Sequence, residues 1–155
     1  MGKFQSTKVF DGFSTVFRQW KADTTHCKYL HGYGVSFKLW FEGELDERNW
    51  VWDFGGMKRA NGTIEGKKPK EWFNYMFDHT VVVAEDDPYR DLFEQMDGEG
   101  VARVRIVPWV GAERFAQFIY EKVNQFIEQE TNGRVRLSRV EFREHSKNTA
   151  IYEPK

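Results

Sequence analysis

The chain has 155 residues, of which 40% are hydrophobic and 17% aromatic, and its formal net charge is −1 at pH 7. This length favours a single domain over residues 1–155, and the near-zero charge argues against a nucleic-acid partner held by a basic surface. One cysteine excludes an intrachain disulfide framework, and without a membrane-length apolar run or a secretion signal we expect a cytoplasmic protein with no membrane partner.

Two strands are predicted near the start of the chain. Residues 8–20 are rich in Val, Phe, Thr and Trp, which is typical of a strand. From Val35 to Phe41, apolar residues occupy every second position, and this alternation predicts a second strand. Extended backwards, the same phase places His31 and Tyr33 on the face of Val35.

The middle of the chain predicts short elements and a loop. Residues 49–54 are interpreted as a further extended segment. The Gly- and Lys-rich residues 55–70 predict a surface loop. Short helices are predicted over residues 69–77 and 87–96.

The last third of the chain gives the clearest pattern. Residues 101–107 predict a strand, and residues 112–130 carry an apolar stripe at helical spacing. Residues 135–144 predict a final long strand, whose alternation changes phase near Ser138-Arg139 and so indicates a bulge. Strands that flank helices in this way predict an α+β fold with a largely antiparallel sheet.

One stretch carries residues suited to catalysis. Cys27 lies four residues before His31 and six before Tyr33, and an Asp78-His79 pair follows well downstream. A cysteine with a separate histidine and aspartate is the outline of a thiol activated by a base. The residues alone leave two other interpretations open, a small buried structural cysteine and a helix-end turn at Asp78-His79 with the histidine near the last carbonyl groups.

Six short motifs follow one another along the chain. They are Phe13–Phe17, Cys27–Tyr33, Asp53–Lys58, Phe77–His79, Val110–Glu113, and Glu144-His145 with Ala150–Tyr152. In this order, the chain resembles the 6-pyruvoyltetrahydropterin synthase and 6-carboxytetrahydropterin synthase (QueD) family. The resemblance implies a tunnelling-fold (T-fold) subunit, with helices on one face of an antiparallel sheet and the sheets of several subunits joined into a barrel. It also implies a homo-oligomer, a trimer or hexamer, with active sites at the subunit interfaces.

The resemblance implies roles for individual residues. Cys27 resembles the catalytic thiol that acts as a general base, and Asp78 and His79 resemble its relay partners. Glu144 resembles the carboxylate that anchors the pterin ring through paired hydrogen bonds. Glu113 resembles the acidic residue at the opening of the helix and is a second candidate for substrate binding.

The implied substrate is a small pterin. The family acts on 7,8-dihydroneopterin triphosphate as a carbon–oxygen and carbon–carbon lyase. The type that this chain resembles most is 6-carboxytetrahydropterin synthase of the queuosine and 7-deazaguanine pathway. Arg18, Lys21 and Lys28 are candidate contacts for the triphosphate, and the sequence does not rank them.

The family's zinc site is altered in this chain. Its three histidine positions read Phe17, His31 and Tyr33. Zinc prefers imidazole, thiolate and carboxylate ligands, so this set predicts weak zinc binding or none. A relocated site that uses His26, His31 and His145 stays open. Two other functions also stay open: a metal-free pterin aldolase or epimerase, and a non-catalytic pterin-binding T-fold protein.

Overall fold

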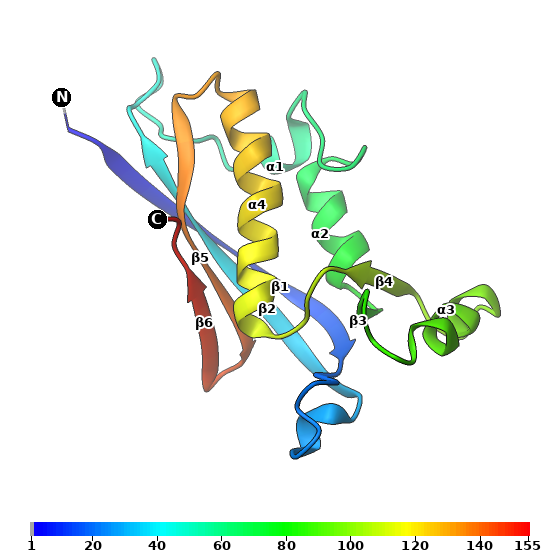
Figure 1. The fold of residues 1–155 in the computed structure, drawn as a ribbon. Helices are drawn as coiled ribbons and strands as arrows, with labels where there is room; N and C mark the ends of the chain where they lie inside the picture. The colour runs from blue at the N-terminus through cyan, green and yellow to red at the C-terminus, as the bar shows by residue number, and fades with distance from the viewer. Residues whose placement is uncertain (1) are drawn as a thin grey trace.

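The computed structural model describes residues 2–155 and is built on one six-stranded mixed sheet with the order β4-β3-β1-β2-β5-β6 (Figure 1). The strands are β1 (Phe4–Phe17), β2 (His31–Gly43), β3 (Thr80–Ala84), β4 (Val104–Val107), β5 (Val135–His145) and β6 (Asn148–Tyr152). The helices are α1 (Gly56–Arg59), α2 (Pro69–Phe77), α3 (Arg90–Gly98) and α4 (Ala112–Glu130). Strands β1, β2, β5 and β6 pair antiparallel, whereas β3 and β4 join the β1 edge in parallel.

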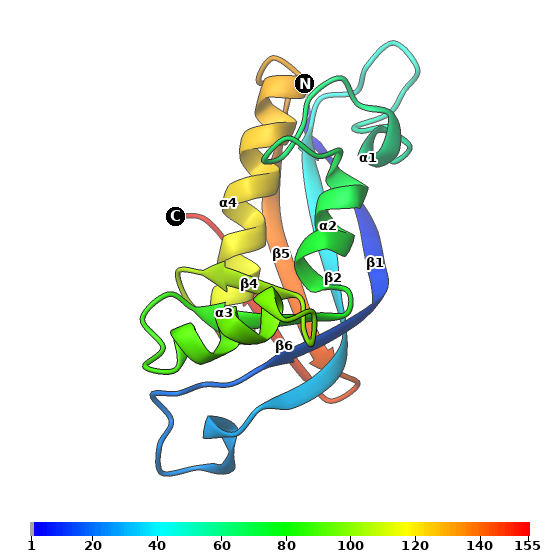
Figure 2. The same ribbon diagram turned by 90° about the vertical axis from the view of Figure 1, so that its right-hand side faces the viewer.

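Helices α2 and α4 pack on the same face of this curled sheet (Figure 2). The apolar stripe of α4 supplies Phe115, whose ring lies 5.0 Å from that of Phe17 on β1 and 5.2 Å from that of Phe142 on β5. All three rings are buried, so the face between helix and sheet is a packed aromatic core. The α+β class and the helix over residues 112–130 are therefore confirmed.

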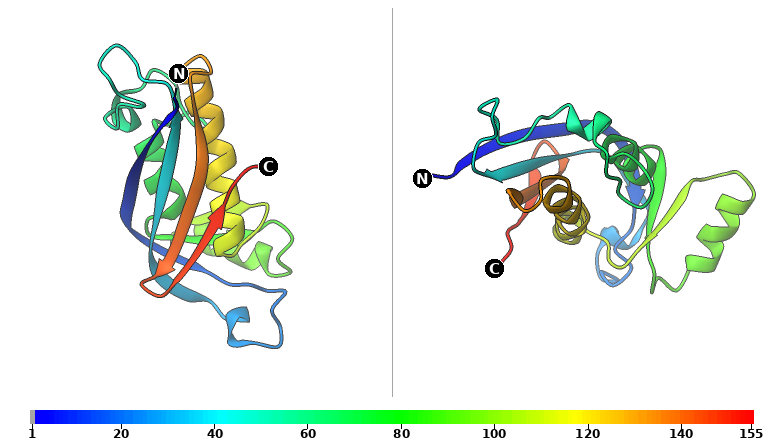
Figure 3. Two further views of the ribbon diagram at one scale, coloured as in Figure 1. Left: turned by 90° about the vertical axis from the view of Figure 1, so that its left-hand side faces the viewer. Right: turned by 90° about the horizontal axis from the view of Figure 1, so that it is seen from above.

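Strands β3 and β4 extend the sheet beyond β1 and, together with α3, project from its side (Figure 3). Val83, Phe93 and Val104 make a small separate core there. No helix within residues 2–155 is both long and apolar enough to cross a membrane.

Two bulges bend the long strands. In β1 the register slips by one residue between Phe10 and Phe13, where Gly12 has φ +83°. In β5 Leu137 and Arg139 pair with neighbouring residues of β2, so Ser138 is the extra residue. The bulge predicted near Ser138-Arg139 is confirmed, and it lets buried residues continue on the same face beyond the phase change.

The predicted elements are wrong at several places. The strand at Thr80–Ala84 was not predicted, because a short strand buried in a parallel pair reads as a continuous apolar run without alternation. The first strand covers Phe4–Phe17 rather than residues 8–20, because an ion pair of Arg18 holds the chain in a loop after it. The strand predicted over residues 101–107 begins only at Val104, and the helix predicted over 87–96 covers Arg90–Gly98.

Residues 49–54 form a turn instead of a strand. The carboxylate of Asp46 accepts hydrogen bonds from the backbone N–H groups of Arg48 and Trp50, and Asn49 adopts φ +67°. The loop predicted over residues 55–70 is partly structured, since it contains α1 and buries Met57. Side chain-to-backbone hydrogen bonds of this kind compete with strand formation.

Candidate functional site

Cys27 lies in a 3₁₀ turn (His26–Lys28) within the loop that joins β1 to β2. The Thr25 hydroxyl caps this turn by accepting a hydrogen bond from the Cys27 N–H at 3.1 Å. The Gln19 N–H donates to the Cys27 carbonyl at 2.9 Å, which ties the two sides of the loop together. The cysteine side chain is half-buried, so its thiol is held in place but still accessible.

A buried ion pair fastens this loop to the rest of the fold. Arg18 Nε lies 2.8 Å from Asp87 Oδ2, and the Asp87 side chain is only 1% exposed. The same guanidinium donates from Nη1 to the carbonyl of Lys28 at 3.0 Å, next to Cys27. The guanidinium of Arg18 is therefore fully used in holding the loop. Lys21 likewise has a partner, since its Nζ lies 3.3 Å from Asp86 Oδ2. The sequence missed the Arg18–Asp87 pair because 69 residues separate its members.

Replacing Asp87 should destabilise the protein strongly. Asp87→Asn leaves the partly buried guanidinium of Arg18 without its countercharge, which costs about 3 kcal/mol of unfolding free energy. Asp86→Asn is the matched control, since its exposed pair with Lys21 contributes about 1 kcal/mol or less. Urea denaturation measures both, and equal losses in the two variants would contradict a structural role for the buried pair.

The three positions at which the family resemblance implied zinc ligands form an aromatic triangle. The centroid of the Phe17 ring lies 4.8 Å from that of His31 and 5.9 Å from that of Tyr33, and the His31 and Tyr33 centroids are 5.1 Å apart. His31 Nδ1 lies 2.7 Å from the carbonyl of Tyr29, so it carries the proton and donates. Pairing of Phe17 with His31 across β1 and β2 fixes this arrangement.

This triangle does not fit zinc. Phe17 has no donor atom, and His31 offers a single free ring nitrogen, Nε2. Nowhere in residues 2–155 do three His, Cys, Asp or Glu side chains gather closely enough to hold an ion. The relocated set of His26, His31 and His145 is therefore not assembled within one subunit.

Restoring the histidines should create zinc binding. The double variant Phe17→His, Tyr33→His would place two more imidazoles beside His31 on adjacent strands. After dialysis against low zinc, we expect the double variant to retain about one zinc per subunit and the unaltered chain to retain none. Tyr33→His alone is the control, because it supplies only two histidines. Stoichiometric zinc on the unaltered chain would contradict the account of this site.

Glu144, near the end of β5, lies on the same end of the sheet. It is half-buried, and burial together with the nearby carboxylate of Glu113 raises its pKa, while His31 and His145 oppose the shift. Glu113 reaches this position from the first turn of α4. Glu144 is therefore a partly desolvated acid with a second carboxylate and two imidazoles nearby.

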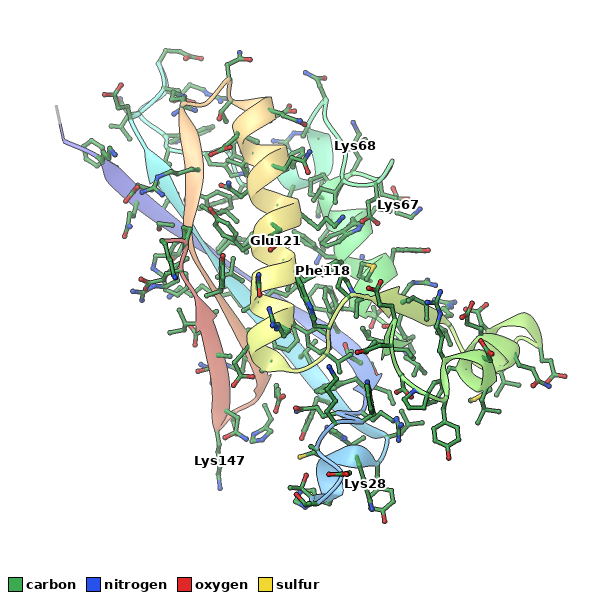
Figure 4. All side chains as sticks on the ribbon, in the orientation of Figure 1. Lys28, Lys67, Lys68, Phe118, Glu121 and Lys147 are labelled. Atoms are coloured by element: carbon green, nitrogen blue, oxygen red, sulfur yellow. The ribbon has the colours of Figure 1, made fainter. Side chains whose placement is uncertain are left out.

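Tyr33 connects Glu144 to the cysteine loop. Its ring lies 5.5 Å from that of His145. Burial raises the pKa of Tyr33, and the neighbouring charges of Glu144 and Cys27 add to this shift. The hydroxyl therefore keeps its proton at neutral pH and can act as a donor. Figure 4 shows this end of the molecule, with Lys147 at the tip of the β5–β6 hairpin and Lys28 on the cysteine loop.

Asp78 and His79 form a dyad away from this cluster. His79 Nδ1 lies 3.0 Å from Asp78 Oδ1, and the Ser14 N–H donates to the same oxygen at 3.1 Å. The Ser14 N–H and the His79 ring both lower the pKa of Asp78. His79 adopts φ +57° and its side chain is 75% exposed, so the ring is presented to solvent.

The structure does not join this dyad to Cys27 within one subunit. No hydrogen bond or ion pair links them in residues 2–155. Tyr33 on β2 and Thr80 on β3 both pair with Thr15 on β1, so the dyad lies two strand spacings, about 10 Å, from Tyr33.

Comparisons with known proteins agree with this fold. A family model described as 6-pyruvoyl tetrahydropterin synthase matches residues 7–155. An uncharacterised protein from Wolinella succinogenes has a similar structure, with a TM-score of 0.77, 22% identity and full coverage of both chains. The 6-pyruvoyl tetrahydropterin synthase of Caenorhabditis elegans matches with a TM-score of 0.65 and 18% identity, and the match covers 100% of this chain and 98% of that chain. The 6-pyruvoyl tetrahydropterin synthase of Plasmodium vivax matches with a TM-score of 0.64 and 13% identity, and the match covers 98% of this chain and 99% of that chain.

These structural matches are too distant in sequence to show more than the fold, and no curated protein matches the sequence. The family model, in contrast, spans nearly the whole chain, including every motif named above. The chain therefore belongs to the 6-pyruvoyl tetrahydropterin synthase family.

Proposed function

We propose that this chain is a pterin-processing lyase that acts on 7,8-dihydroneopterin triphosphate, most like 6-carboxytetrahydropterin synthase of the queuosine and 7-deazaguanine pathway. The observation that carries the proposal is Glu144, half-buried beside Glu113 and within reach of Tyr33. A carboxylate has two acceptor oxygens that match the adjacent N–H donors of a 2-amino-4-oxo pteridine. Family membership supports a pterin as the class of substrate.

The neighbouring residues suit proton transfer to and from the pterin side chain. In its thiolate form, Cys27 removes a proton from a side-chain carbon of the bound pterin. The protonated Tyr33 hydroxyl donates a hydrogen bond to the oxygen on which negative charge develops. The core side of the site is closed by the buried rings of Phe17 and Phe115, so water can approach only from the open side.

Asp78 and His79 complete the site from a second subunit in this proposal. Two free sheet edges offer a means of assembly. Strand β1 has no strand partner on its outer side from Phe4 to Ser14 within the described chain, and β6 is the last strand at the opposite edge. Unpaired edges of this length invite pairing with another chain. A trimer or hexamer joined through these edges would bring the dyad of one subunit to the Cys27 loop of the next.

Product analysis tests the proposed activity. Purified protein is incubated with 7,8-dihydroneopterin triphosphate, with and without a chelator, and the products are identified by mass spectrometry. We expect a 6-carboxy or 6-pyruvoyl tetrahydropterin that still forms after chelation, because the residues at the zinc positions do not fit the ion. Absence of both products in every condition, with added zinc included, would reject the lyase.

The aromatic triangle favours a second candidate function. A family member without a zinc site could carry out aldolase- or epimerase-like chemistry on 7,8-dihydroneopterin, with Cys27 as base and Tyr33 as acid. Incubation with dihydroneopterin and analysis of cleaved or epimerised pterins distinguishes it from the lyase. If neither substrate reacts but a dihydropterin raises the melting temperature, the chain is a non-catalytic pterin-binding protein.

A further inference from the structure

Three strands run parallel at one side of the sheet, and a cleft lies at their carboxyl ends. Strand β3 pairs in parallel with both β1 and β4, so the segments that follow Phe17, Ala84 and Val107 leave the sheet at the same end. Figure 2 shows β3, β4 and the loop after β1 at one end of the molecule. The cleft has a volume of about 460 Å³, which is within the size range of small-molecule sites.

All three of these segments line the cleft. The loop after β1 supplies residues 19–22, the turn after β3 supplies Asp86, and the segment after β4 supplies residues 108–110. Arg114 closes the cleft from the first turn of α4. In open sheets of parallel strands, ligands bind in the crevice outside the carboxyl ends of the strands. The topology therefore favours this cleft as a place for a ligand.

The cleft is separate from the residues proposed to hold the pterin. Its lining contains neither Tyr33 nor Glu144, which lie on β2 and β5, on the other side of β1 from β3 and β4. It also contains no residue of the two free sheet edges, β1 from Phe4 to Ser14 and β6. Pairing of subunits through those edges therefore does not use the residues that line the cleft.

Two indole rings, each with a cation beside it, give the cleft its chemistry. Arg114 Cζ lies 4.5 Å from the centroid of the Trp109 ring, and Lys21 Nζ lies 5.4 Å from that of Trp20. Both indoles are half-buried, so the fold holds them while part of their surface reaches the cleft. Flat heteroaromatic rings stack on such side chains whatever their pattern of hydrogen-bonding groups.

The charges of the lining favour an anionic group on that ring. Asp86 accepts a hydrogen bond from Trp20 Nε1 at 3.2 Å and pairs with Lys21 at 3.3 Å, so its charge is already engaged. Arg114 donates to the side-chain oxygen of Gln117 at 2.8 Å and forms no ion pair within residues 2–155. A guanidinium binds phosphate through paired hydrogen bonds, and here it lies beside an indole face.

We propose that this cleft binds a flat heteroaromatic ring that carries a phosphate, which is the chemistry of a mononucleotide. The ring packs on the exposed parts of Trp20 and Trp109, and the phosphate lies at Arg114. The site is additional to the pterin site and does not depend on the proposed function.

Calorimetric titration with adenosine 5′-monophosphate (AMP) tests the site, with adenosine and ribose 5-phosphate as separate halves of the ligand. We expect the unaltered protein to bind AMP more tightly than either half. Arg114→Gln should weaken AMP binding about tenfold, the effect of losing one charge-assisted contact, and should leave adenosine binding unchanged. Trp109→Leu should weaken the binding of both AMP and adenosine about tenfold, the effect of losing one stacking partner.

Arg103→Gln and Trp50→Leu are the matched controls, because both residues are exposed and lie outside the cleft. Both control variants should bind AMP like the unaltered protein. Arg114 is also exposed, so its variant should fold even if Trp109→Leu does not.

Three results would overturn the site: no AMP binding by the unaltered protein, unchanged binding in both cleft variants, or equal weakening in the cleft and control variants. Displacement of bound AMP by 7,8-dihydroneopterin would overturn it as well, because the cleft would then belong to the pterin site. AMP binding that depends on Arg114 and Trp109 supports the site even if no pterin is turned over, so the two proposals fail separately.

Discussion

Glu144→Gln should lower pterin turnover strongly and yet make the ligand-free protein more stable. The amide keeps one acceptor but turns a donor toward a donor of the pterin, so kcat/KM should fall about 100-fold or more. The gain in stability follows from burial, which raises the pKa of Glu144 in the folded state. A neutral glutamine avoids the cost of holding a partly desolvated charge beside Glu113.

The pH dependence of the unfolding free energy shows why Glu144→Gln should stabilise the protein. An unfolded glutamate titrates near 4.3, and the pKa of Glu144 is higher in the folded protein. Between these two values the folded state binds more protons, so stability falls as pH rises through that window, and the loss is complete once the pH exceeds the folded-state pKa. Glu144→Gln should remove this part of the pH dependence, as urea denaturation at acidic and neutral pH would measure.

Glu141→Gln is a suitable control for both effects. Glu141 is on the same strand as Glu144. Because side chains alternate between the two faces of a sheet, Glu141 lies on the other face, where it pairs with Arg143 at 3.4 Å. It should change neither turnover nor the pH dependence. Unchanged kcat/KM in Glu144→Gln, or lower stability at neutral pH, would contradict the role of Glu144 as a desolvated pterin anchor.

Cys27→Ala should lower kcat about 10³-fold while the pterin still binds. Loss of a positioned general base typically removes 10²- to 10⁴-fold of rate, whereas the ring-binding contacts at Glu144 remain. The thiol is half-buried in a turn held through backbone groups by Thr25 and Gln19, so unfolding free energy should change by less than about 1 kcal/mol.

Single-turnover rates and a binding titration check these expectations separately. Because Cys27 is the only cysteine, its alkylation rate also reports directly on thiol reactivity. Asp87→Asn should raise this rate by loosening the loop that Arg18 holds. Full activity in Cys27→Ala would exclude the thiol as the base and would move that role to Tyr33.

Local patterns predicted the parts of the fold that depend on local sequence. The stripe of α4 and the alternation of β2 both place buried residues at the period of their element, and the structure has them there. The bulge at Ser138 was visible as a change of phase. Strand β3 was missed because both its neighbours bury it, so Thr80–Ala84 shows neither alternation nor a helical period.

The candidate site likewise contains residues that are close in the sequence and residues that only the fold brings together. Cys27, His31 and Tyr33 lie within one short stretch, and in the fold Tyr33 lies beside His31 and near Cys27. Residues that meet only through the fold gave no signal. Asp87 reaches Arg18 from the turn after β3, 69 residues further along the chain.

The central claim is that this chain binds a dihydropterin at Glu144 without a zinc ion. Calorimetric titration of the metal-stripped protein with 7,8-dihydroneopterin triphosphate tests it most directly. We expect one pterin to bind per subunit before any zinc is added, with binding lost in Glu144→Gln and kept in Glu141→Gln. Binding that appears only after zinc is restored, or that Glu144→Gln leaves unchanged, would contradict it.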